Sequence, residues 1–318
     1  MTSFSKFLPA LALLGATLLT PLDAKPDQGK VWTDPEAAKA EDPDFSFQGE
    51  YGIAEAGADF GAQVVALGQG EFDIYLLVGG LPGLGWERGH GRTVVRAKRD
   101  GDKITGAAAG KKIAVSIAGG KLTGNQEDQE FELPRLERQS PTLGAQAPEE
   151  ATVLFDGSSA EHWEKGQVEN GLLAATGATS KPLFKDYTAH LEFRTPYKPA
   201  ARGQARGNSG IYWGGRWETQ VLDSFGLDGK QNECGGIYSI AEPKLNMCLP
   251  PLAWQTYDVD FTAAKFDDDG KRTAWPRITV KLNGVVVHDD LELAKDLTTA
   301  APIKGPLKDE GGPMFLQD

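Results

Sequence analysis

Short apolar runs that end in glycine-containing turns recur along most of the chain, and this pattern constrains its fold more than any other feature. In the first half, the runs lie at 63–67, 72–78, 93–98 and 113–117, with turns at Gly68-Gln69-Gly70, Asp100-Gly101 and Gly119-Gly120. The 39 glycines and 19 prolines among 318 residues suit many short strands and few helices. A short helix is expected from Asp34 to Ala40, because Pro35 fits a first helical turn. The sequence therefore predicts an all-β chain.

The first 24 residues have the pattern of a secretory signal peptide. A single lysine, Lys6, precedes an apolar run at 7–19, and a short polar stretch ends at Ala24. The run contains a proline and a glycine and is shorter than the ~20 apolar residues that span a bilayer. We therefore expect export to a secreted or periplasmic location, without membrane insertion. A formal net charge of −12 argues against a nucleic-acid partner, because it repels phosphate backbones.

The rest of the chain divides into two predicted domains. A small β domain is expected at 25–138, and a linker at 139–151 contains two prolines and a glycine but no apolar periodicity. The second domain spans 152–318. Within it, the Lys281–Val285 segment predicts a hairpin, because Asn283-Gly284 suits the two positive φ angles of a type I′ turn. Its many strand patterns predict an antiparallel β-sandwich or jelly roll.

The two cysteines, Cys234 and Cys248, bracket one short stretch of the second domain. In an oxidising compartment we expect them to form a disulfide. It would close a loop of about 15 residues and contribute roughly 3 kcal/mol in the chain-entropy model. Two buried free thiols are the alternative, because the sequence does not give the pairing geometry.

The segment from Arg206 to Asp223 carries a dense pattern of polar and aromatic residues. A two-residue turn at Gly214-Gly215 would place six side chains on one face of a hairpin. These are Trp213 opposite Arg216, Ile211 opposite Glu218, and Ser209 opposite Gln220. The opposite face would hold Asn208, Tyr212, Trp217, Thr219 and Val221. An aromatic ring among such polar groups suits sugar recognition, and a plain solvated sheet face is the alternative.

Six motifs of the second domain occur in the order typical of a known family. They are Leu154–Gly157, His190–Arg194, Arg206–Tyr212, Glu218–Ser224, Gly235–Tyr238 and Trp254–Asp258. Over about 152–318 the chain resembles the 3-keto-disaccharide hydrolase domain family, formerly a domain of unknown function. The first domain resembles a β domain found ahead of such hydrolase domains in secreted bacterial proteins, and it brings no known chemistry.

This resemblance implies a concanavalin-like β-sandwich or jelly roll that acts on sugars already oxidised to a ketone at C3. Members typically continue past a Leu-Gln-Asp motif with a histidine and another strand, whereas this chain stops at Leu316-Gln317-Asp318. The resemblance therefore leaves open a sandwich that lacks its last strand.

The implied substrate suggests a mechanism for a secreted hydrolase of 3-keto-glycosides. A C3 ketone acidifies the hydrogen on C2, so a base can promote elimination of the C1 substituent before water adds. We choose Glu218 as the base, with Glu192 and Asp223 as alternative carboxylates. Donors to the enolate oxygen are expected from Arg206 and Asn208. The sugar would contact Trp213, Ser209, Arg216 and Gln220, with Trp213 stacking on the ring.

The sequence fixes neither a cofactor nor a metal site. The sequence does not decide whether a divalent metal binds at the leaving oxygen. An oxidised sugar or glycoside is the expected partner. The alternative function is a carbohydrate-binding module of the same fold without catalysis.

Overall fold

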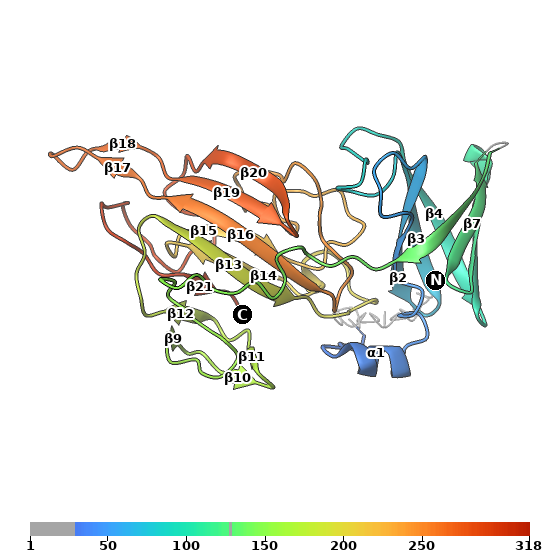
Figure 1. The fold of residues 1–318 in the computed structure, drawn as a ribbon, viewed down its shortest axis with the longest axis horizontal. Helices are drawn as coiled ribbons and strands as arrows, with labels where there is room; N and C mark the ends of the chain where they lie inside the picture. The colour runs from blue at the N-terminus through green and yellow to red at the C-terminus, as the bar shows by residue number, and fades with distance from the viewer. Residues whose placement is uncertain (1–28, 127–128) are drawn as a thin grey trace, which may run out of the picture.

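The computed structural model describes residues 29–126 and 129–318, and the expected signal peptide at 1–24 lies outside the described residues. Two β units lie side by side along the long axis of the molecule (Figure 1). We call the first unit the barrel and the second the sandwich. The all-β fold that the sequence predicts is confirmed.

The barrel is a closed antiparallel sheet of eight strands, in which β1 pairs with β8 to complete the ring. Its strands are β1 (Gly49–Tyr51), β2 (Phe60–Gly68), β3 (Glu71–Val78), β4 (Arg92–Asp100), β5 (Lys103–Ala108), β6 (Ile113–Ala118), β7 (Lys121–Gln126) and β8 (Gln129–Leu136). A 3-10 turn, η1 (Ala109–Lys111), joins β5 to β6. Closure leaves no free sheet edge. Alternate side chains, including Val64, Ile74 and Val95, are fully buried inside the ring.

Helix α1 (Pro35–Glu41) packs against the barrel core through Ala38. Its first turn is capped by Asp34, whose Oδ1 accepts a hydrogen bond from the Ala37 N–H at 2.8 Å. Pro35 occupies the first turn, where no backbone N–H is needed. The helix predicted from this proline is therefore confirmed.

The sandwich consists of two antiparallel sheets that pack face to face. The five-stranded sheet has the order β15 (Trp217–Val221), β14 (Ser209–Trp213), β21 (Phe315–Leu316), β12 (Ala178–Ser180) and β9 (Trp163–Glu164). The four-stranded sheet has the order β13 (Tyr187–Arg194), β16 (Trp254–Thr262), β19 (Arg277–Leu282) and β20 (Val285–Glu292). Two ribbons, β10 (Val168–Glu169) with β11 (Leu172–Leu173) and β17 (Lys265–Phe266) with β18 (Arg272–Ala274), and a 3-10 turn, η2 (Gly203–Ala205), complete it.

Aromatic and branched side chains from both sheets form one hydrophobic core between them. The ring of Trp217 on β15 lies 5.8 Å from that of Phe261 on β16, centre to centre. The hairpin predicted at Asn283-Gly284 is also confirmed, because Leu282 pairs with Val285 and the two turn residues have φ angles of 52° and 80°. The sandwich predicted from the strand pattern is thus present.

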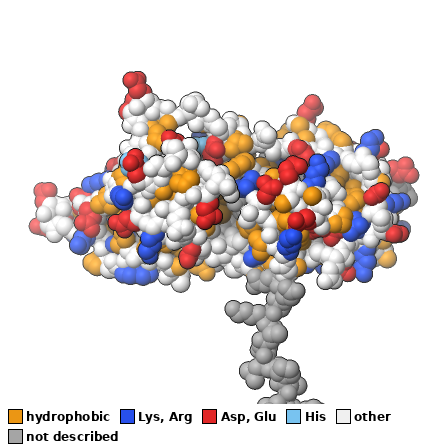
Figure 2. Space-filling model, turned by 90° about the horizontal axis from the view of Figure 1, so that it is seen from below, with side chains coloured by type: hydrophobic (Ala, Val, Ile, Leu, Met, Phe, Trp, Pro, Cys, Tyr) orange, Lys and Arg blue, Asp and Glu red, His pale blue; other side chains and the backbone are white. Residues whose placement is uncertain are grey.

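The two units share a contact in which Tyr197 of the sandwich enters the barrel core. Trp32 and Tyr197 exchange backbone hydrogen bonds of 3.1 and 2.9 Å, and the Tyr197 hydroxyl donates to Asp42 Oδ2 at 3.0 Å. On the face shown in Figure 2, acidic and basic side chains are interspersed over both units. Among the described residues, no helix has the length and apolar character needed to cross a membrane.

Candidate active site

The hairpin β14–β15 differs in register from the prediction. Its loop has three residues, Gly214 to Arg216, so Trp213 pairs with Trp217 and Tyr212 with Glu218. The two-residue turn is therefore wrong. The physical reason lies in Arg216, whose N–H donates to Trp213 O at 3.0 Å and whose guanidinium binds carbonyls far along the chain. A slip of one residue moves every side chain of a strand to the other face.

The new register changes which residues lie beside Glu218. Tyr212 and Gly210 of β14 share its face, and Asn208, just before β14, follows the same alternation. Ile211 and Trp213 instead point into the sandwich core. Trp213 is fully buried and donates its indole N–H to Thr219 Oγ1 at 2.7 Å, so it presents no ring face to a sugar. The stacking role predicted for Trp213 does not fit this position.

Glu218 is a buried carboxylate with one firm hydrogen bond. Its side chain is 3% exposed, and Oε2 accepts from the Tyr212 hydroxyl at 2.7 Å. The carboxylate lies directly over Gly210, where a Cβ would come within 2.7 Å of Glu218 Cγ. Burial raises the pKa of Glu218 above its ordinary value, while the Tyr212 hydrogen bond acts to lower it. A carboxylate with a raised pKa that is held in place is suited to act as a general base.

Two partly exposed amides lie near this carboxylate. Asn208 Oδ1 accepts from Gln220 Nε2 at 2.6 Å, which leaves the Asn208 amide N–H groups free to donate. Gln317, next to β21, has its Oε1 3.4 Å from the Tyr212 hydroxyl, and its backbone N–H donates to Gly210 O at 2.9 Å. Gln220 is fully buried, and its Oε1 has no hydrogen-bond partner among the described residues. Donors for an oxygen of a bound molecule are therefore present beside Glu218.

Ser209 turns its hydroxyl to the end of the chain. Its Oγ donates to Gln317 O at 2.8 Å. The contact ties β14 to β21 and so fixes the position of Gln317. The Ser209 hydroxyl therefore contacts the backbone of Gln317.

Arg206 and Asp223 form a buried ion pair at the open end of the hairpin. Arg206 Nε and Nη2 both reach Asp223 Oδ2, at 2.9 and 2.6 Å, and the two side chains are 6% and 0% exposed. Asp223 Oδ1 accepts from the Phe225 N–H at 3.3 Å. Burial raises the pKa of Asp223, and the Arg206 charge opposes that shift. In this structure the Arg206 guanidinium and the Asp223 carboxylate are therefore paired with each other.

Arg216 holds a loop in place. Its guanidinium donates to Gly305 O at 3.0 Å and Pro306 O at 3.1 Å, and the side chain is almost fully buried. Arg216 itself lies in the loop of the hairpin, and the carbonyls that it binds belong to the segment that precedes β21. Among the described residues, the Arg216 guanidinium bonds to backbone carbonyls of this segment rather than to Glu218, which it was expected to accompany.

The sequence of the second unit matches a defined family. A family model described as a 3-keto-alpha-glucoside-1,2-lyase-like domain matches residues 150–318, which is more than half of the chain. The chain belongs to this family. The resemblance inferred from the six motifs is confirmed. We refer to residues 150–318, which contain the sandwich, as the lyase-like domain.

Two solved structures from Parabacteroides distasonis ATCC 8503, both of candidate glycosyl hydrolases, are similar to this chain. One is 32% identical with a TM-score of 0.49, and the match covers 54% of this chain and 77% of that one. The other is 18% identical with a TM-score of 0.35, and the match covers 52% and 86%. A comparison with curated proteins gave no match.

Glu192 lies in the other sheet of the lyase-like domain, on β13. Its Oε1 accepts from the backbone N–H of Gly144 and lies 3.4 Å from His190 Nε2. His190 Nδ1 in turn lies 2.6 Å from Asp258 Oδ1, and Thr142 donates to Asp258 Oδ2 at 2.7 Å. Glu192 thus helps to fasten the segment after the barrel to this sheet, away from Glu218.

The structure does not show the disulfide predicted between Cys234 and Cys248, and both residues are free thiols in it. Both lie in the core of the lyase-like domain. Cys234 Sγ is 3.4 Å from the Tyr257 hydroxyl, and Cys248 Sγ is 3.4 Å from Leu249 O. The hydrogen bond to Cys234 and burial raise the pKa of Cys248. The alternative of two buried thiols describes this arrangement.

Two residues of the site were missed by the sequence reasoning. Tyr212 was placed on the face opposite Glu218 because of the wrong register, and Gln317 appeared as part of a terminal motif without a role. A three-residue turn that begins at Gly214 places Tyr212 opposite Glu218, and the sequence is compatible with such a turn. In the part of the chain that the structure describes, no group of three or more histidine, cysteine, aspartate or glutamate side chains is arranged to hold a metal ion.

Proposed function

We propose that the lyase-like domain cleaves 3-keto-glycosides by elimination across C1 and C2, followed by addition of water at C1. The family match over 150–318 supports the substrate class. The observation that supports the chemistry is the carboxylate of Glu218, which is buried and hydrogen-bonded to Tyr212 at 2.7 Å. Its raised pKa favours proton abstraction from a carbon acid.

The reaction starts at C2, where the neighbouring ketone makes the hydrogen acidic. Glu218 removes this proton through Oε1, for which the described residues offer no hydrogen bond, and the ketone oxygen becomes an enolate oxygen. The enolate reforms the ketone as a C1=C2 double bond forms and the C1–O bond breaks. The departing oxygen takes up a proton and leaves as an alcohol. Water then adds to C1 and a proton returns to C2, which gives the 3-keto-monosaccharide.

The amides beside Glu218 stabilise the enolate. Asn208 retains free N–H groups because its carbonyl oxygen accepts from Gln220. Gln317 supplies a second amide, which the Ser209 hydrogen bond holds beside Tyr212. Donors that are already oriented stabilise developing charge without reorganising, and this is often the largest catalytic contribution.

A pair of matched substitutions tests this assignment. We expect Glu218→Gln to retain binding of a 3-keto-disaccharide while turnover falls by about 100-fold or more, as for loss of a general base. Glu192→Gln, in the other sheet, should keep near-normal turnover. Exchange of the C2 hydrogen in D₂O should be lost with Glu218→Gln. Near-normal turnover by a folded Glu218→Gln protein would reject Glu218 as the base.

The substrate itself separates catalysis from binding. The keto form should be cleaved and its unoxidised parent should not, because the parent lacks the ketone that acidifies C2. Retention of the keto form without turnover would instead favour the carbohydrate-binding module. We further propose that the protein acts outside the cytoplasm after removal of about the first 24 residues. N-terminal sequencing of the exported protein should find Lys25 close to its start.

A further inference from the structure

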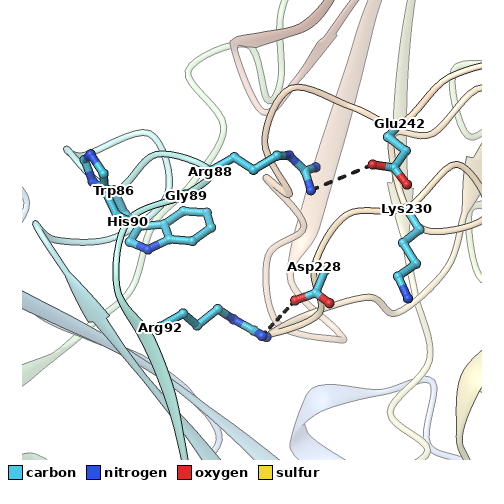
Figure 3. A pocket seen from close by; sticks show the side chains of 8 residues that line it. All are labelled: Trp86, Arg88, Gly89, His90, Arg92, Asp228, Lys230 and Glu242. Atoms are coloured by element: carbon cyan, nitrogen blue, oxygen red, sulfur yellow. Dashed lines mark hydrogen bonds and ion pairs between the residues drawn. The ribbon is translucent and has the colours of Figure 1, made fainter.

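An open pocket of about 370 Å³ lies where the barrel meets the lyase-like domain (Figure 3). The segment between β3 and β4 supplies Trp86, Arg88 and His90, and Arg92 begins β4. The long segment after β15 supplies Asp228, Lys230 and Glu242. None of these residues belongs to the Glu218 site. The pocket is therefore separate from the Glu218 site, and residues of both units line it.

The two arginines of the pocket are held rigidly by the interface. Arg88 Nη2 donates to Gly229 O at 2.9 Å and Pro243 O at 2.8 Å. The guanidinium of Arg92 stacks on the Tyr75 ring at 4.1 Å and donates to Asp228 Oδ1 at 2.7 Å. Groups that are already ordered lose little conformational entropy when a ligand binds. The interface thus builds a pre-organised wall of cationic side chains.

Cations and hydrogen-bond donors outnumber acceptors in this pocket. Three basic side chains, those of Arg88, Arg92 and Lys230, face two carboxylates, those of Asp228 and Glu242. The Lys230 ammonium has no carboxylate partner among the described residues, and Arg88 Nη1 lies as far as 4.0 Å from Glu242. In a chain with a formal charge of −12, this local excess of positive charge stands out.

Trp86 adds an aromatic ring to the same wall (Figure 3). Its side chain lines the pocket and is 9% exposed, and its indole N–H is buried where a molecule in the pocket does not reach it. The part of Trp86 that a ligand can contact is therefore its ring, which suits the apolar face of a sugar.

We propose that the pocket binds a sugar acid, a small ligand that combines one carboxylate with several hydroxyl groups. The carboxylate pairs with Lys230, and the apolar face of the sugar ring packs on Trp86. Asp228 and Glu242 accept hydrogen bonds from hydroxyl groups, and they disfavour a dianion such as phosphate. The pocket volume suits a ligand of one or two sugar rings.

Calorimetric titration of the full mature protein tests this proposal, with D-glucuronate as the probe and D-glucose and inorganic phosphate as comparisons. We expect glucuronate to bind more tightly than either comparison, with an affinity that falls as salt rises. Lys230→Met should weaken glucuronate by about tenfold or more, which corresponds to loss of a charge-assisted hydrogen bond. Trp86→Leu keeps an apolar side chain but removes the aromatic ring, and it should weaken binding by roughly threefold to tenfold.

Lys244→Met is the matched control, because Lys244 lies on the same segment but pairs with Asp289 at 3.7 Å. Equal loss in both lysine variants, tighter binding of phosphate, or no binding of glucuronate would each overturn the proposal. The test is independent of the Glu218 chemistry. Glucuronate should still bind to Glu218→Gln, and Lys230→Met should leave turnover of a neutral 3-keto-disaccharide unchanged.

Discussion

The chemistry of Glu218 depends on two opposing effects on one carboxylate. Burial raises its pKa, and the Tyr212 hydroxyl, 2.7 Å from Oε2, favours the charged form. Glycine at position 210 gives the carboxylate room to lie against the strand. The sequence alone does not show this contact, because the contact requires Tyr212 and Glu218 to lie opposite each other in the hairpin. The sequence could name Glu218 as a polar mid-strand residue, but it could not identify its partner.

Removing the Tyr212 hydroxyl should shift the pH dependence of catalysis. A general base works when deprotonated, so the rate rises with pH through its pKa. Because Tyr212 lowers the pKa of Glu218, Tyr212→Phe should move the acidic limb of the kcat/KM profile to higher pH. Tyr238→Phe is the control, since Tyr238 contacts Glu218 through a backbone hydrogen bond of 3.0 Å. An unmoved or lower limb in Tyr212→Phe would contradict this account.

His288 should make stability depend on pH. Burial lowers its pKa to about 4, and its Nε2 lies 2.7 Å from Gly235 O. In the unfolded chain the His288 imidazole takes up a proton near pH 6.5, whereas in the folded chain it does so only near pH 4. The neutral, buried His288 therefore contributes to the free energy of unfolding above pH 6.5, and this contribution is lost as the pH falls toward 4. The loss should reach about 3 kcal/mol.

Urea denaturation from pH 8 to pH 4 measures this effect. His288→Gln keeps a donor for Gly235 O but does not titrate. The variant should therefore show a shallower decrease in the free energy of unfolding than the native protein. Parallel pH profiles for the two proteins would show that other groups cause the acid sensitivity.

At the scale of elements, the two hairpins show which registers a sequence can predict. Asn283-Gly284 favours one turn type through local conformational preference, and the hairpin predicted there is confirmed. Gly214 and Gly215, with φ angles of 59° and 67°, fit turns of either two or three residues. The choice between them depends on Arg216, which bonds to carbonyls of Gly305 and Pro306. Such a distant contact is not encoded locally, so the register could not be predicted.

The Asn283-Gly284 hairpin also contacts the segment after the barrel. A Cβ at Gly284 would lie 2.5 Å from Pro141 Cγ, and the residue has a φ of +80°. Gly284→Ala should therefore cost backbone strain of roughly 1–2 kcal/mol and also displace Pro141. Gly270→Ala is matched in backbone conformation, with a φ of +75°, but has open space around its Cβ.

Urea denaturation of both glycine variants separates the two costs. The free energy of unfolding should fall by at least about 1 kcal/mol more for Gly284→Ala than for Gly270→Ala. Equal losses would mean that the contact with Pro141 is accommodated without cost.

At the scale of the whole molecule, alternation and turn signals predicted β structure in both units. They did not predict that the first sheet closes into a ring or that the two units share a contact. Closure depends on β1 pairing with β8, at opposite ends of the barrel sequence. The contact depends on Tyr197, which the sequence places in the second unit and the structure places in the core of the first. Pairings between distant residues leave no local pattern.

Tyr197 should make the barrel and the sandwich unfold together. Its ring lies 5.4 Å from Trp32 and 5.0 Å from Phe45, centre to centre, and its hydroxyl binds Asp42. Tyr197→Ala would leave a cavity there and should lower the free energy of unfolding by about 3–5 kcal/mol. Tyr197→Phe should lose only the hydrogen bond, about 1 kcal/mol.

Hydrogen exchange in rising denaturant tests this coupling at β2 of the barrel and β16 of the sandwich. In the native protein, the slowest amides of both strands should exchange through the same global opening. With Tyr197→Ala, the β2 amides should exchange at lower denaturant than those of β16, because the barrel loses a core residue. Independent opening of the two strands in the native protein would show that Tyr197 does not couple them. The pocket between the units would then lack the rigid frame that its proposed ligand requires.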